Sequence, residues 1–305
     1  MIKTLYTISG GIGLGELLQY LITGLTIGSI YAIVALGFVT VYSVTKVINL
    51  AQGEFVMLGG MTMFSLLSFG VPYFIAFLLT IVIVVILGYL LELSIIRRAR
   101  KADALSLIIL TIGASIFVRG IASMVWGKNP VKIEPFMNND PINIFGAAIT
   151  PQSIWVMVIL LICVTLLFFI MERTMIGKAF RACSANPMAA RLMSISPAKM
   201  SSFSFILSAA LGAIAGLAIA PILFPAYDMG SMLGIKGFSA SILGGLGSAP
   251  GAVIGGLILG LMESLGAGYI SSGLKDAIVF GVILIILLIR PYGIMGEKNI
   301  GKGGL

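Results

Sequence analysis

Residues 55–91 read FVMLGGMTMFSLLSFGVPYFIAFLLTIVIVVILGYLL, and none of them is charged. One membrane-spanning helix needs only about 20 apolar residues, so this run is too long for a single crossing. Gly70-Val71-Pro72 interrupts the run, and proline cannot continue a helical hydrogen-bond ladder. We therefore expect two apolar elements here, one over residues 47–69 and one over Tyr73–Leu93.

The composition of the whole chain indicates the same environment. Of 305 residues, 59% are apolar and 10% are charged, and the mean hydropathy is +1.14. Soluble globular domains have roughly 45–50% apolar and about 25% charged residues, so that class is excluded. The net charge of +8 does not indicate a nucleic-acid partner, because such a module needs a polar basic surface. The expected surrounding is a lipid bilayer.

Other charge-poor runs predict further membrane elements. They are Leu17–Thr45, Ala104–Trp126, Ser153–Met171, Ser202–Leu223, Gly237–Leu265 and Leu274–Ile289. Residues 128–152 are rich in proline and asparagine and are expected to form a loop. The prediction is an all-α polytopic membrane protein with about eight transmembrane elements, in which residues 1–305 form a single transmembrane domain.

Basic residues predict the orientation, because Lys and Arg accumulate in short cytoplasmic loops. They cluster in segments 97–101 and 172–201 and in the tail, as Arg290, Lys298 and Lys302. Segment 127–152 instead balances its two lysines with Glu134 and Asp140. We therefore expect the three basic segments, including the C-terminus, in the cytoplasm and residues 127–152 outside.

This orientation restricts the glycine-rich run Gly237–Leu265. The neighbouring spans already connect the two faces, so this run must cross an even number of times or not at all. Gly244-Gly245-x-Gly247-Ser248-Ala249-Pro250-Gly251 supplies a break at its centre. The run is therefore predicted to be broken or re-entrant, which is tolerated only where the irregular backbone is buried in protein or lines a cavity.

The element at 47–69 is a second candidate for an interrupted helix. Asn49, Gln52, Gly53 and Glu54 lie inside its otherwise apolar pattern. If it is also re-entrant, the N-terminus is cytoplasmic. Two interrupted elements in corresponding halves indicate a transport path between them. These four residues are therefore candidates for the substrate path.

Gly244, Gly245 and Gly247 are further candidates for the path. The recurrence of Gly247, Gly251 and Gly255 every four residues nevertheless favours close helix packing over direct contact with substrate.

Intramembrane charges are costly and are functional by default. Glu54 is the best candidate, because its carboxylate could meet a zwitterionic ligand; the alternative is a pair with Lys46 or Lys236 near an interface. For Arg119 we expect that the side chain extends to the outer interface. Glu263 is expected in an interface ion pair, and Glu92 in a local pair with the cluster that begins at Arg97.

The polar segment 172–201 predicts a short cytoplasmic helix. Asn186 can cap it and Pro187 fits its first position, where a missing N–H is not needed. Residues 188–193 continue it and Ser196-Pro197 ends it. Small residues on one side suit docking into a groove of another protein; a helix lying on anionic lipid is an equal alternative.

Three motifs, in this order, resemble one known family. Ile48-Asn49-Leu50-Ala51-Gln52-Gly53-Glu54 resembles the early INxAxGE element of branched-chain amino acid ABC-transporter permeases. Lys178-Ala179-Phe180-Arg181-Ala182-Cys183, followed by Ala190-x-Leu192-x-x-Ile195, resembles their coupling loop. The run Ile242–Gly256 resembles their late glycine-rich element, which related sugar permeases share. The resemblance covers roughly residues 17–290; one departure is Ser194, where the family usually has glycine.

The resemblance implies a transport subunit rather than an enzyme. Such permeases pair with a second permease, here expected to be a different chain, and with two cytosolic ATPases, and they receive substrate from an extracytoplasmic binding protein. The implied location is a prokaryotic inner membrane. The residues expected to contact an ATPase are Arg181, Asn186, Pro187, Ala189, Ala190, Arg191, Leu192 and Ser194.

The sequence itself agrees with this division of labour, because it contains no GxxxxGK[ST] phosphate loop. No catalytic residue, metal or cofactor is predicted, and there is no histidine. Cys163 lies in an apolar run and Cys183 in a basic segment, so no disulfide is expected between them.

Two alternatives to this function stay open at this point. Urea or short amides are possible substrates, since their permeases look similar. An ion-coupled secondary transporter is less favoured, because it would need several intramembrane carboxylates and would leave the long polar loop unexplained.

Overall fold

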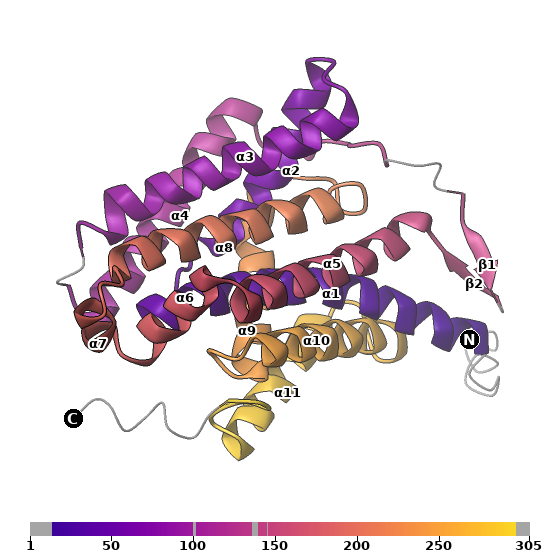
Figure 1. Cartoon of the computed structure of the whole chain (residues 1–305). Coiled ribbons are helices and arrows are strands. Elements are labelled where there is room, and N and C mark those ends of the chain that lie inside the picture. Colours follow the sequence, from indigo (N-terminus) through magenta and orange to yellow (C-terminus); the bar gives the residue numbers. More distant parts are fainter. Residues whose placement is uncertain (1–13, 100–101, 136–139, 145, 297–305) are drawn as a thin grey trace.

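The computed structural model describes residues 14–99, 102–135, 140–144 and 146–296 (Figure 1). Six residues of the sequence-based predictions lie outside these ranges: Arg100, Lys101, Asn138, Asn139, Lys298 and Lys302.

Within the described ranges the chain is almost entirely helical. The α-helices are α1 (Leu14–Thr45), α2 (Gln52–Ser68), α3 (Tyr73–Leu91), α4 (Ala104–Trp126), α5 (Pro151–Arg173), α6 (Met175–Ala185), α7 (Pro187–Leu192), α8 (Pro197–Ile219), α9 (Met229–Gly244), α10 (Ala249–Tyr269) and α11 (Lys275–Ile289). A π-helix, η1 (Glu92–Ile96), extends α3. The all-α prediction therefore holds for the membrane part, and the break at the proline of residue 72 is present between α2 and α3.

Six described helices are long and apolar enough to cross a membrane: α1, α3 with η1, α4, α5, α8 and α10. The prediction was about eight transmembrane elements. The difference arises from α2 and α11, which have 17 and 15 residues; α9, with 16 residues, forms the first part of the run whose second part is α10. At 1.5 Å per residue, each is shorter than the ~30 Å hydrocarbon core of a bilayer.

Of the two elements predicted to be interrupted, the run Gly237–Leu265 is divided between α9 and α10, whereas the element at 47–69 contains one continuous helix, α2, preceded by a non-helical segment. Residues 46–51, between α1 and α2, are not helical, although Asn49 and Ala51 are buried. Four residues separate α9 from α10, and Gly245 and Gly247 in this turn have φ values of +106° and +98°. Positive φ is accessible to glycine without a steric penalty, which explains the glycines at this break. Figure 1 shows α9 running across the other long helices rather than along them.

The centre of the bundle is α1, which packs on α10 through glycines. A Cβ on Gly260 would overlap the backbone of Gly28, and a Cβ on Gly256 would overlap that of Ala32. Backbones can approach this closely only where side chains are absent. By contrast, α3, α4 and α5 expose apolar side chains such as Phe117 and Leu161, as expected for helices that face lipid or another subunit.

The two ends of the bundle differ. One, here called the hairpin end, carries the antiparallel strands β1 (Ile142–Ile144) and β2 (Ala147–Ile149) beside the start of α1 (Figure 1), where the Ala148 N–H donates to Gln19 Oε1 at 2.7 Å. The other, the basic end, carries α6 and α7. The hairpin lies in the segment expected to be a loop, and α6 was not predicted as a separate helix.

Candidate functional site

The N-termini of α2 and α9 meet beside α4. A Cβ on Gly53 would overlap the carbonyl of Gly230, and one on Gly230 would lie 2.8 Å from Glu54 Oε2. The Glu54 carboxylate thus lies in the first turn of its own helix and close to the first turn of α9. Helix N-termini carry partial positive charge, so both helix starts favour an anion at this place.

Glu54 is buried and pairs with α4. Its Oε1 accepts a hydrogen bond from Ser115 Oγ at 2.8 Å and lies 3.4 Å from an Arg119 guanidinium nitrogen. Ser115 also accepts from Arg119 at 3.1 Å. Residues four apart lie on one helix face, which is why Ser115 and Arg119 reach the same carboxylate.

This geometry corrects two predictions. Lys46 and Lys236 were the alternative partners predicted for Glu54. It contacts Arg119 and Ser115 instead. Arg119 does not simply extend to an interface; it turns towards the buried carboxylate because an unpaired charge inside the membrane would cost several kcal/mol.

The hydrogen bonding around this cluster is incomplete. Among the described residues, four buried polar atoms near the two helix starts have no hydrogen-bond partner: Glu54 Oε2, Arg119 Nε, Asn49 Nδ2 and Ser231 Oγ. Buried polar groups are normally satisfied, so this group of exceptions makes the place a candidate site.

The other two polar residues of the early motif hold the chain in place. Asn49 Oδ1 accepts from the Ala51 N–H at 3.2 Å, and Thr111 Oγ1 of α4 accepts from the Leu50 N–H at 3.2 Å. Gln52 donates to the Ser208 carbonyl of α8 at 3.0 Å and also bonds its hydroxyl. These bonds satisfy the irregular backbone inside the bundle, as a membrane interior requires.

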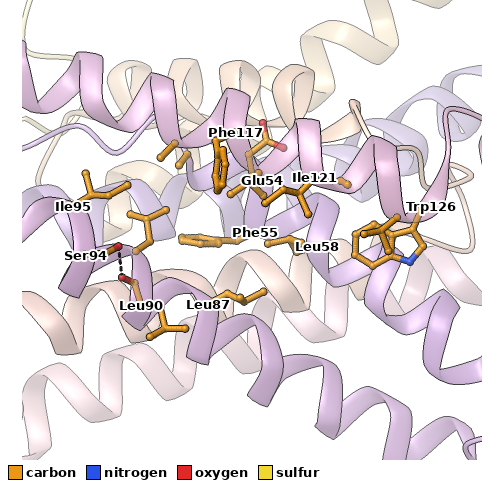
Figure 2. Close-up of a pocket in the computed structure, with 16 residues that line it drawn as sticks. Glu54, Phe55, Leu58, Leu87, Leu90, Ser94, Ile95, Phe117, Ile121 and Trp126 are labelled. Carbon is orange, nitrogen blue, oxygen red and sulfur yellow. Dashed lines mark hydrogen bonds between the residues drawn. The ribbon is translucent and has the colours of Figure 1, made fainter.

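An apolar cavity of about 330 Å³ lies between α2, α3 and α4. Figure 2 shows Phe55 and Leu58 between Leu87 and Leu90 of α3 and Phe117 of α4, with the Glu54 carboxylate at the edge. Its lining is almost wholly hydrocarbon, so it offers little to orient a polar ligand.

The glycine candidates lie at the other end of α9, about 20 Å away by the helical rise of its 16 residues. Gly244 packs directly on the backbone of Gly251 in α10. Gly247 borders a cavity of about 490 Å³ at the basic end, together with Lys46 and Arg181. The structure therefore does not bring these glycines together with the Glu54 group; close packing holds for Gly244 and Gly245, whereas a Cβ on Gly247 would meet nothing within 4 Å.

A second buried charge cluster joins α1, α9, α10 and α11. Lys236 Nζ lies 2.6 Å from Glu263 Oε1 and 2.8 Å from Asp276 Oδ1. The Tyr31 hydroxyl donates to Glu263 Oε2 at 2.7 Å. Glu263 was expected in an interface ion pair near Lys275 and Asp276. Lys275 Nζ does lie 3.5 Å from Glu263 Oε1, but Glu263 is only 4% exposed and its closer partner is the buried Lys236. Sequence reasoning missed Lys236 as a cluster member, although a lone lysine in an apolar run was the signal.

The predicted pair of Glu92 is confirmed. Arg97 donates to Glu92 Oε2 at 3.0 Å, and Ser201 and Ser202 of α8 donate to the same carboxylate at 3.2 and 2.9 Å. The cluster ties the end of α3 to the start of α8.

In the basic loop, α7 forms as predicted. Asn186 Oδ1 accepts from the Met188 and Ala189 N–H groups, both at 3.0 Å, and Pro187 is the first helical residue. After the helix, the Ile195 N–H donates to the Ala190 carbonyl at 3.0 Å and Ser194 has a φ of +61°. This is a Schellman ending, whose left-handed position prefers glycine. The departure noted at Ser194 therefore changes the side chain and keeps the turn.

The surface of α7 has two different sides. Ala190 is buried against Val44, Phe180 and Cys183. Met188, Leu192 and Met193 are instead 72%, 85% and 76% exposed. Ala189 and Arg191 are also exposed, and Arg181 pairs with Glu172 at 2.5 Å. The exposed apolar side consists of long side chains, and of these only Leu192 was predicted to contact an ATPase. Residues 188 and 192 are four apart and both apolar, a spacing that could have identified Met188 as well.

Comparisons with known proteins decide the family. Residues 20–288 match the model of the family described as branched-chain amino acid transport system, permease component. The chain belongs to this branched-chain amino acid permease family. The high-affinity branched-chain amino acid transport system permease protein LivH of Escherichia coli (strain K12) is 32% identical over 93% of this chain and 97% of its own length.

Other members of the permease family are similar over most of the chain. BraD of Pseudomonas aeruginosa, a permease protein of the same description, is 31% identical over 93% of this chain and 97% of its own. LivM of Salmonella typhimurium is 23% identical over 88% of this chain and 68% of its own. No solved structure matches. The chain is thus a multi-pass membrane transport subunit and not an enzyme.

Proposed function

We propose that this chain is the inner-membrane permease subunit of an ABC importer, forming half of the translocation path for branched-chain or similar apolar amino acids. The match of residues 20–288 to the permease family carries the proposal. Relatives that the chain covers almost completely are named for branched-chain amino acid transport.

The partners follow from the same relationship. Two cytosolic ATPases would supply the energy, and an extracytoplasmic binding protein would deliver substrate. A second permease of a different type would complete the path; in Salmonella typhimurium, LivH and LivM are both named as permease proteins of the high-affinity branched-chain system.

The basic end would receive the ATPases. The exposed apolar side of α7, with Met188 and Leu192, is the surface that would enter an ATPase groove. The rigid cap at Asn186 and the packing of Ala190 would transmit its displacement to α1 and α8.

In the proposed cycle, ATP binding closes the ATPase dimer, moves α6 and α7 and shifts the population towards an outward-open path. The binding protein then releases its substrate into the path, and hydrolysis restores the inward-facing state. The meeting point of the N-termini of α2 and α9 is the proposed place of passage, because helix N-termini at transport sites point at charged groups of the substrate.

The alternative of an ion-coupled transporter finds no support in the buried carboxylates. Glu54, Glu92 and Glu263 are each held by a basic side chain. A carboxylate that carries a coupling ion must be free to bind it, whereas each of these three already contacts a basic side chain.

Reconstitution with the neighbouring permease, ATPases and binding protein tests the proposal. L-leucine uptake into proteoliposomes should require ATP, and the loaded binding protein should stimulate hydrolysis. Uptake of urea but not of L-leucine would show that the substrates are urea or short amides rather than apolar amino acids. Uptake driven by a proton gradient without ATPases would overturn the proposal.

A further inference from the structure

Two opposite charges face each other where the N-termini of α2 and α9 meet. Glu54 is 2% exposed in its side chain, and Arg119, 3.4 Å away, is 30% exposed. The guanidinium therefore lies at the open side of the carboxylate. Asp228 immediately precedes α9, is exposed and adds a second negative charge near Glu54.

The pair is weaker in geometry than the other buried pairs of the described chain. Lys236 approaches Glu263 to 2.6 Å and Arg97 approaches Glu92 to 3.0 Å, whereas Arg119 reaches Glu54 at 3.4 Å through one atom. Both members also keep an unsatisfied atom, Oε2 of Glu54 and Nε of Arg119. Each can accept a further partner of opposite charge without losing all its present bonds.

Breaking such a pair inside a membrane requires a replacement for each charge. A cation alone would satisfy Glu54 and leave Arg119 unpaired, and an anion alone would do the reverse; each uncompensated buried charge costs several kcal/mol. A zwitterion replaces both partners at once and leaves the local charge unchanged.

We propose that Glu54 and Arg119 form a subsite that binds the charged end of a zwitterionic amino acid by exchanging their mutual ion pair for two pairs with the substrate. The ammonium group lies against Glu54 and Asp228, and the carboxylate against Arg119. This rests on the proposed function and adds to it the residues that select the substrate class.

The subsite also distinguishes amino acids from the other ligands considered, which are urea, short amides and lipid. Urea and short amides carry neither charge and cannot separate the pair. A lipid acyl chain fits the apolar cavity of Figure 2 but offers no donor to Glu54 Oε2. The exposed apolar residues Met232 and Ile235 on α9 continue from the charged group and suit an aliphatic substrate side chain.

The test measures equilibrium binding to the purified four-subunit complex in nanodiscs, without binding protein. The ligands are L-leucine, leucinamide, which lacks the carboxylate, and 4-methylpentanoate, which lacks the ammonium group. Arg119→Gln should weaken L-leucine and 4-methylpentanoate about tenfold, or ~1.4 kcal/mol, and should strengthen leucinamide, because its ammonium group then pairs with Glu54 without leaving an unpaired guanidinium. Glu54→Gln should weaken L-leucine and leucinamide and, for the same reason, strengthen 4-methylpentanoate.

Glu263→Gln is the matched control, because Glu263 is equally buried and ion-paired but lies in the other cluster. It should leave all three affinities unchanged, and Arg119→Lys should restore most of the L-leucine affinity. Equal losses for all ligands in both variants would show that the pair only holds α2 to α4, which overturns the subsite. Failure of the wild-type complex to transport L-leucine would overturn the proposed function instead; transport without any effect of either variant would overturn the subsite alone.

Discussion

At the scale of single residues, Ser194 shows how a backbone turn can tolerate a side chain that it does not prefer. Its φ of +61° is left-handed, and a non-glycine residue there costs about 1–2 kcal/mol. Ser194→Gly should therefore raise the thermal midpoint of the purified protein. The gain in stability should be at most ~1 kcal/mol, because the greater freedom of glycine in the unfolded chain offsets part of the relieved strain.

The same change at Ser184 gives the opposite sign and serves as the control. Ser184 is helical in α6, where glycine destabilises by about 0.5–1 kcal/mol. Equal shifts for the two variants would contradict the left-handed turn at Ser194.

The residues also show which features a sequence can predict. The cap at Asn186 and the pair of Glu92 with Arg97 are local, within five residues, and both were predictable. The pair of Glu54 with Arg119 joins residues from different helices, as does that of Lys236 with Glu263. Periodicity reveals an element but not its neighbour, so these long-range partners appear only when the helices are packed.

At the scale of elements, α7 separates two uses of small residues. Ala189 lies on the exposed side of α7. Ala189→Trp should therefore leave the melting temperature unchanged and lower leucine-stimulated ATP hydrolysis in the complex. Ala190→Trp lies in the packed side, where added bulk typically costs about 1–3 kcal/mol, so it should lower stability as well. Normal hydrolysis and uptake in Ala189→Trp would favour a lipid-surface helix.

The contact of α1 with α10 is a second prediction at this scale. Gly256→Leu would force these helices apart, since a Cβ there already overlaps Ala32, and should prevent accumulation of folded protein or lower its midpoint strongly. Gly281→Leu on α11 is the control, because a Cβ there meets nothing within 4 Å. Equal effects of both variants, seen by size-exclusion chromatography, would contradict the close approach.

The elements themselves were largely visible in the sequence, for a physical reason. Charge-free runs bounded by polar residues give helices, and α4 begins and ends where its run does. The path of α9 was not predictable, because a glycine-rich run specifies close packing without specifying direction. The helix α6 was missed since its capping residue, Thr174, and its two buried side chains lie in a segment that reads as a polar loop.

At the scale of the whole molecule, the arrangement fixes which segments share a side of the membrane. The hydrogen bond between Ala148 and Gln19 places the start of α1 at the hairpin end. Lys46, Arg181 and Ser248 border one cavity at the basic end. The positive charges of that end favour the cytoplasm, so residues 128–152 and the start of α1 should both lie outside. A cytoplasmic start of α1, expected if 47–69 were re-entrant, does not fit this arrangement.

Cysteine labelling of intact cells with a membrane-impermeant maleimide tests this topology. The native thiols give little background: Cys163 and Cys183 are both buried, and burial raises the pKa of the Cys183 thiol, which lowers its reactive thiolate fraction. Glu16→Cys and Asn143→Cys, at exposed positions of the hairpin end, should be labelled, whereas Ala185→Cys at the basic end should react only after the cells are opened. Labelling of Ala185→Cys but not Asn143→Cys would invert the orientation. Labelling of Asn143→Cys without Glu16→Cys would instead contradict the shared side of α1 and the hairpin, because a helix that starts beside β2 must present its first turn to the same compartment.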